Sequence, residues 1–259
     1  MSHRVLAELP PEWQTLRKPP ERVWYRGDPA LLERPKVSIV GTRRPLAYTR
    51  HYVRELARGL ARRGVAVVSG AAMGVDAQAH LGAGPEHTIA VTATGIDRRY
   101  PAVNRALIEQ IEERGLVLTR FEPGSGATRW GLVLRNELVV ALGKVLVIAE
   151  ADPGSGSLRS AEYALKQGKE IWVLPHRLGE SEGTRQLLRE GAARPIEDLE
   201  GFLERFGREP SGAREWGEWE IFCQGGPTLE EAVARFGDRV YEEELAGTIR
   251  IERGRIVPL

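Results

Sequence analysis

Between residues 37 and about 191, short apolar segments alternate with stretches of helical periodicity. The runs at 37–41 and 65–68 are almost continuously apolar, and a helical pattern at 47–63 separates them. Strands that are apolar on both faces are typical of a parallel sheet covered by helices on both sides. The alternation therefore predicts an α/β, doubly wound, mostly parallel sheet, whose ligands bind at the carboxyl ends of its strands.

The same pattern predicts the remaining elements of this domain. Further strands are expected at 88–93, 116–121, 144–150 and 170–174, and helices at 76–82, 103–114, 130–142 and 158–167. We assign residues 1–36 to an N-terminal segment and 37–207 to the α/β domain.

The composition changes after Gly207. Residues 208–219 are rich in Gly, Pro, Ser and charge and predict a linker, and 220–259 predict a small second unit. Thr228 followed three residues later by Glu231 is a capping-box pattern for a helix to about Phe236. A second helix at 241–245 and a hairpin at 248–257 would make this unit a reduced winged helix.

The net charge of +1 is the sum of a basic N-terminal part and an acidic C-terminal part of the chain. Residues 1–196 carry 29 basic and 21 acidic residues, a net charge of +8, whereas 197–259 carry 8 and 15, a net charge of −7. Since a domain that binds phosphates needs a basic surface, the first unit fits a nucleic acid and the second does not. Of the 37 basic residues, 32 are Arg, which a GC-rich genome would also produce.

Several classes of protein are excluded by what the sequence lacks. One cysteine, Cys223, permits no internal disulfide or Cys-rich zinc site, and the five histidines show no metal spacing. The chain has no dinucleotide-binding glycine fingerprint and no P-loop. No apolar run is long enough to span a membrane, and the first 20 residues lack a signal-peptide core. We expect a cytoplasmic protein without a metal or other cofactor.

Four predicted strand ends carry small-residue turns, at 41–44, 69–76, 94–97 and 153–157. Glycine lets backbone N–H groups approach a phosphate, and a following helix start adds positive potential. Hydroxyls at Thr42, Ser155 and Ser157, with the forked donor Arg43, complete what an anion pocket needs. A row of arginines spaced by four (50, 54, 58 and 62) is either a solvated helix face or a rail for a polyanion, and we favour the former.

The chain resembles the DprA/Smf family of DNA-processing proteins over about residues 9–193. The resemblance is carried by a series of motifs that follow one another in the order typical of the family. The first three are Val-Trp-Tyr-Arg-Gly-Asp at 23–28, Gly-Thr-Arg at 41–43, and Ser-Gly-Ala-Ala-Met-Gly-Val-Asp at 69–76 followed by His80. Next come Thr-Ile-Ala-Val at 88–91, Gly-Ile-Asp at 95–97, Tyr-Pro-x-x-Asn at 100–104, Arg-Asn at 135–136 and Ser-Gly-Ser-Leu at 155–158.

This resemblance implies a Rossmann-like domain that binds single-stranded DNA, forms a homodimer and loads RecA during natural transformation, without being an enzyme. The residues it places at the DNA are Gly41, Thr42, Arg43, Ser69, Gly70, Ala71, Arg129, Trp130, Leu132, Arg135, Asn136, Ser155, Gly156, Ser157 and Lys169. Two positions depart from the family: Leu132 where an aromatic contacts DNA, unless nearby Trp130 replaces it, and Glu137 where Arg is usual. Stacking on an aromatic is worth about 1–3 kcal/mol per base.

Two alternatives belong to other classes. Pro153–Ser157 is similar to the glycine-rich motif of Rossmann-like nucleoside-monophosphate phosphoribohydrolases, but the expected catalytic acid would fall on Arg159 or Ser160, and Glu162 is the nearest carboxylate. A nucleotide-binding module would instead need a closed pocket, whereas a strand needs an open groove.

Overall fold

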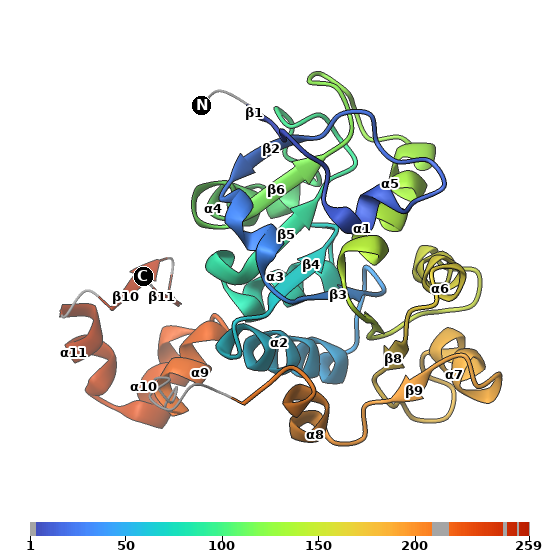
Figure 1. The fold of residues 1–259 in the computed structure, drawn as a ribbon. Helices are drawn as coiled ribbons and strands as arrows, with labels where there is room; N and C mark the ends of the chain where they lie inside the picture. The colour runs from blue at the N-terminus through green and yellow to red at the C-terminus, as the bar shows by residue number, and fades with distance from the viewer. Residues whose placement is uncertain (1–3, 209–217, 246–247, 253, 259) are drawn as a thin grey trace. The chain divides into compact units, whose positions relative to one another are not determined.

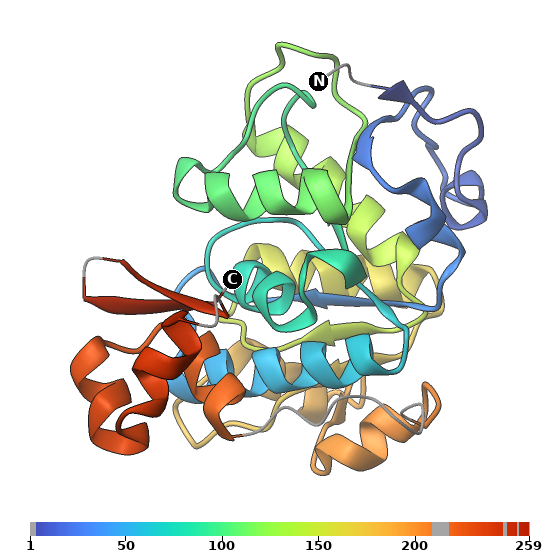
Figure 2. The same ribbon diagram turned by 90° about the vertical axis from the view of Figure 1, so that its left-hand side faces the viewer.

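The computed structural model describes residues 4–208, 218–245, 248–252 and 254–258. The chain divides into two compact units, Met1–Pro210 and Ser211–Leu259. Figures 1 and 2 show the first unit as a sheet with helices on both faces.

Within the described residues, nine strands form one sheet in the order β1-β2-β6-β5-β4-β3-β7-β8-β9. The strands β3 to β9 pair in parallel, and β1 and β2 add an antiparallel edge next to β6. The sheet is thus mostly parallel, as predicted. The strands are β1 (Arg4–Val5), β2 (Trp24–Gly27), β3 (Lys36–Val40), β4 (Ala66–Ser69), β5 (Thr88–Val91), β6 (Leu116–Thr119), β7 (Leu146–Ile148), β8 (Ile171–Val173) and β9 (Arg194–Pro195).

The continuous apolar runs are explained by burial on both faces of the sheet. In β3, Val37 and Ile39 pack into one core and Val40 into another, because successive side chains point to opposite faces. One face is covered by α2 (Ala47–Arg62), α3 (Val75–Ala83), α4 (Arg105–Arg114) and α8 (Leu199–Glu204). The other face is covered by α1 (Pro11–Gln14), α5 (Arg129–Leu142), α6 (Gly156–Lys166) and α7 (Glu182–Arg189).

The strand order reverses next to β3. The chain runs from β3 outward through β4, β5 and β6, and then returns to β7 on the other side of β3. Open α/β sheets bind ligands at such a switch point, outside the carboxyl ends of the strands. The turns at 41–44 and 153–157 follow β3 and β7 and therefore lie at this point.

The sequence did not reveal the edge elements of the sheet. Residues 1–36 contribute β1, β2 and α1, and their side chains Trp13 and Leu31 are buried in the core of the first unit. The sequence pattern does not predict strand β9 or helices α7 and α8 either. These pieces are two to eight residues long, too short for a period to be read from the sequence. The expected helix at 103–114 is a 3₁₀ turn (Ala102–Asn104) followed by α4.

The second unit has α9 (Glu218–Gln224), α10 (Leu229–Phe236), α11 (Arg239–Leu245) and a hairpin of β10 (Ile249–Glu252) and β11 (Arg255–Pro258). Thr228 and Glu231 form the expected capping box. The expected linker lies largely at 209–217, outside the described residues, but its last two residues belong to α9. Trp219 there is buried in the small core beside Cys223. The unit has the two expected helices and the hairpin, and α9 is a third helix that the sequence did not predict.

Candidate nucleic-acid interface

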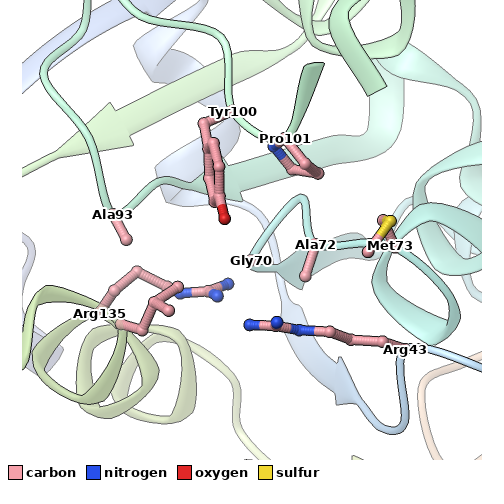
Figure 3. A pocket seen from close by; sticks show the side chains of 9 residues that line it. Arg43, Gly70, Ala72, Met73, Ala93, Tyr100, Pro101 and Arg135 are labelled. Carbon is pink, nitrogen blue, oxygen red and sulfur yellow. The ribbon is translucent and has the colours of Figure 1, made fainter. Parts of the chain in front are cut away.

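A pocket lies at the carboxyl ends of β3, β4 and β5 (Figure 3). Three loops and α5 supply its walls, and its lining is Arg43, Gly70, Ala72, Met73, Ala93, Tyr100, Pro101, Leu132 and Arg135. The guanidinium groups of Arg43 and Arg135 and the hydroxyl of Tyr100 point into the same space. The lining contains two cations and no carboxylate, so its chemistry suits an anion.

Arg135 is held inside the protein by Asp76. Its side chain is 7% exposed, and Nη1 donates to Oδ2 of Asp76 at 3.4 Å. The same carboxylate oxygen accepts from the backbone N–H groups of Gly70, at 3.1 Å, and Ala72, at 3.3 Å. Asp76 therefore fixes both the loop after β4 and the cation that lies over it.

The two pocket cations repel one another. Burial is the largest cause that lowers the pKa of Arg135, Asp76 opposes it, and the charge of Arg43 lowers it further. Arg43 is exposed and forms no ion pair with the described residues. Because two like charges converge here and only Arg135 has a counter-ion, Asp76, an anion between the two guanidinium groups would relieve the repulsion.

Most of the predicted residues after β3 and β4 shape the pocket through the backbone. Gly41 has no room for a Cβ because Val75 lies against it, and the backbone N–H of Thr42 donates to the carbonyl of Glu150 at 2.8 Å. Ser69 is buried, and its hydroxyl donates to the carbonyl of Ile39, so it does not face the pocket. Ala71 is also buried and adopts a left-handed conformation with φ of 55°.

The predicted residues of α5 separate into two groups. Leu132 and Arg135 line the pocket. Arg129 and Trp130, in the first turn of α5, are exposed and outside the lining, Trp130 at 69% exposure. The pocket wall at the family's aromatic position is thus aliphatic.

The turn after β7 forms a neighbouring surface. Ser155, Gly156 and Ser157 begin α6 without lining the pocket. A Cβ on Gly156 would lie 3.9 Å from Nδ2 of Asn136, so this predicted residue of α5 borders the start of α6. The buried Oγ of Ser155 has no hydrogen-bond partner among the described residues. The hydroxyl of Ser155 is therefore an unused hydrogen-bonding group beside the switch point.

Lys169 lies away from the pocket, so its position does not support the prediction that it contacts DNA. It precedes β8, so it lies at the amino edge of the sheet, opposite the pocket. Its ammonium donates to the carbonyls of Val140, Ala141 and Gly143 at the end of α5. A lysine at a helix C-terminus satisfies carbonyls that lack intrahelical partners. Burial lowers the pKa of Lys169 to about 8.

The structure adds pocket residues that the sequence did not single out. Tyr100 and Pro101 belong to the Tyr-Pro-x-x-Asn motif, and Asn104 of the same motif donates to the carbonyls of Ala71 and Ala72. This motif was the signal that could have placed Tyr100 in the site.

The arginines of α2 do not form a free rail. Arg54 donates to Gln78 at 2.6 Å, Arg58 is buried against Glu55, and Arg50 donates to the carbonyl of Pro45. The arginines named here are therefore engaged within the protein, and the expectation of a solvated face is wrong for Arg58, which is buried. Among the described residues there is no metal-binding cluster of His, Cys, Asp and Glu, and none of the helices there is both long and apolar enough to cross a membrane.

A doubly wound α/β sheet with a pocket at its switch point is the architecture of Rossmann-like ligand-binding proteins. Within this class, residues 4–207 match the family model of DNA recombination-mediator protein A, and the chain belongs to that family.

Named relatives agree with this assignment. The chain is 35% identical to Protein Smf of Synechocystis over 73% of its length, and 34% identical to DNA processing protein DprA of Streptococcus pneumoniae over 67%. These alignments cover 48% and 62% of the relatives, so the chain spans about half to three fifths of their length.

Two solved structures share the fold. A Helicobacter pylori DNA processing protein A, described for its single-stranded DNA binding mode, superposes with a TM-score of 0.77 at 39% identity, covering 78% of this chain and 94% of that one. DprA of Streptococcus pneumoniae gives a TM-score of 0.73 at 29% identity, covering 80% and 75%.

Proposed function

We propose that this protein binds the backbone of single-stranded DNA, with a phosphate between Arg43 and Arg135, and so protects incoming DNA during natural transformation. The observation that carries the proposal is the convergence of the two guanidinium groups in a pocket without a lining carboxylate. The Helicobacter pylori relative, whose structure concerns single-stranded DNA binding, supports it.

Such a site recognises phosphate and carries no base sequence information. Binding would therefore be tolerant of sequence and strongly dependent on salt. The acidic second unit adds no attraction for DNA, so the first unit carries the binding.

Family membership indicates a DNA-binding rather than a catalytic protein, and we propose that the chain has no phosphoribohydrolase activity. Glu162, the carboxylate nearest the glycine-rich turn, is exposed on α6 and absent from the pocket lining. A general base must reach its substrate within hydrogen-bond distance. Release of base from nucleoside monophosphates that disappears in Glu162→Gln would contradict this.

The deciding experiment is an anisotropy titration of labelled oligo-dT at several salt concentrations, with matched duplex DNA as competitor. We expect preference for the single strand and an affinity that falls steeply with salt. Equal competition by the duplex, or no binding at low salt, would refute the proposal.

The family resemblance further supports a homodimer that hands the strand to RecA. Light scattering of the purified protein tests the first part, and RecA filament formation on covered single strands, with and without the protein, tests the second.

A further inference from the structure

Two tyrosines of α2 form an exposed aromatic surface outside the pocket. Tyr48 and Tyr52 are one helical turn apart, with ring centroids at 4.7 Å and planes inclined at 50°. The residues are 39% and 37% exposed, so each keeps part of a ring open to solvent. Burial, followed by the neighbouring Tyr52, raises the pKa of Tyr48, so its phenol stays neutral at physiological pH.

His176 supports this tyrosine surface (Tyr48 and Tyr52) through its contact with Tyr48. The ring of Tyr48 stands edge-on to His176 at 5.4 Å, and the side chain of His176 is fully buried. Nδ1 of His176 bonds to the carbonyl of Leu174 and Nε2 bonds to Oγ1 of Thr49, both at 2.9 Å. Because both ring nitrogens are fixed, Tyr48 rests on a rigid support.

One residue connects the tyrosine surface to the pocket. The carbonyl of Glu150 accepts from the backbone N–H of Thr42, and its carboxylate accepts from the backbone N–H of Leu46 and the hydroxyl of Thr49. The segment from Thr42 to Thr49 is thus held at both ends. Arg43 and Arg44 lie within this segment, and both are exposed and form no ion pair with the described residues. The side chain of Arg43 reaches into the pocket.

We propose that Tyr48 and Tyr52 form a stacking platform for unpaired bases of the strand whose phosphate lies between Arg43 and Arg135. The proposal rests on the proposed function and extends it to the bases. Exposed rings beside unpaired arginines are the combination with which proteins grip single-stranded nucleic acid. The pocket lining is aliphatic at Leu132 and offers one aromatic ring, that of Tyr100, whereas the tyrosine surface offers two.

The chemistry favours nucleic acid over a protein partner. A base presents a flat π-face to each ring, and its adjoining phosphate meets the free cations of Arg43 and Arg44. A second copy of this chain would bring the same cations and repel them. The strand would then pass from the pocket along the carboxyl ends of β3, β7 and β8, where His176 follows β8.

The test distinguishes binding to the bases from binding to the phosphate backbone. Oligo-dT and an abasic oligonucleotide of equal length are titrated against the full chain and the variants Tyr48→Ala, Tyr52→Ala and Tyr48→Phe. Tyr241→Ala, which removes a tyrosine of similar exposure (46%) in the second unit, is the matched control. Thermal unfolding of each variant establishes that it is folded.

We expect the wild type to bind oligo-dT more tightly than the abasic strand. Tyr48→Ala and Tyr52→Ala should each weaken oligo-dT binding about fivefold or more, with abasic binding and the salt slope unchanged. Tyr48→Phe and Tyr241→Ala should retain wild-type affinity.

An equal loss on both strands, no loss in either alanine variant, or a changed oligomeric mass with unchanged affinity would overturn the platform. If the wild type binds neither strand, it is the proposed function itself that fails.

Discussion

Arg135 lies against Gly70 so closely that a Cβ at residue 70 would overlap its Nη1 atom. The glycine of the β4 turn is therefore the space into which the pocket's buried guanidinium fits. Asp76 holds the two together by bonding to both. Gly70 and Arg135, 65 positions apart in the sequence, together place a positive charge in the pocket.

Gly70→Ala should displace Arg135, weaken oligo-dT binding about tenfold and lower the unfolding temperature, because the displaced cation loses Asp76. Anisotropy titration and thermal unfolding measure these effects. Gly126→Ala is the matched control, because nothing lies within 4 Å of a Cβ there. In the double variant Gly70→Ala/Arg135→Ala the two losses should not add, and additive losses would show that the residues act separately.

Arg43→Ala should reduce oligo-dT affinity about tenfold or more and leave the fold intact, because the exposed side chain packs no core. The slope of log affinity against log salt should fall by about 0.7, the value for one phosphate contact on a single strand. Arg114→Ala is the control, because it removes a cation at the end of α4, at the opposite edge of the sheet. It should change neither the oligo-dT affinity nor the salt slope. Wild-type binding by Arg43→Ala would contradict the site.

The parallel core of the sheet was predictable because its strands are buried on both faces and therefore continuously apolar. The antiparallel strand β2 was not, since the charged Arg26 and the partly buried Tyr25 within it break that apolar pattern. Arg43 and Arg135 were placed correctly at the pocket through their motifs. The position of Lys169 away from the pocket was not predictable, because it depends on the strand that follows it and on the carbonyls at the end of α5 to which its ammonium donates.

Lys169→Met tests whether Lys169 stabilises the fold or contacts DNA. The substitution leaves the carbonyls of Val140, Ala141 and Gly143 without their ammonium donor, so the free energy of unfolding should fall by about 1–3 kcal/mol. Oligo-dT affinity should stay within about twofold of the wild type, since a lost phosphate contact would cost more. Lys166→Met, at an exposed lysine of α6, is the control for charge and should leave both quantities unchanged. A tenfold loss of affinity in Lys169→Met alone would return Lys169 to the DNA path.

His80 makes stability depend on pH. It is fully buried on α3, neither ring nitrogen has a hydrogen-bond partner among the described residues, and burial, followed by the charge of Arg135, lowers its pKa to about 3. The unfolded chain, with a histidine pKa of about 6.5, binds a proton at pH 5 that the folded protein does not. Stability from this group is complete above about pH 6.5 and is lost as the pH falls toward 3. At pH 5 the loss relative to pH 7.5 is about 2 kcal/mol.

Urea unfolding of the wild type and of His80→Leu at both pH values measures this difference. Leucine carries no titrating group and leaves no buried ring nitrogen without a partner, so the variant should lose about 2 kcal/mol less than the wild type between pH 7.5 and pH 5. An identical pH dependence in the two proteins would mean that the imidazole takes up its proton without unfolding. In that case the protonated ring would face Arg135 directly, and oligo-dT binding by the wild type should change between pH 7.5 and pH 5 in a way that His80→Leu does not reproduce.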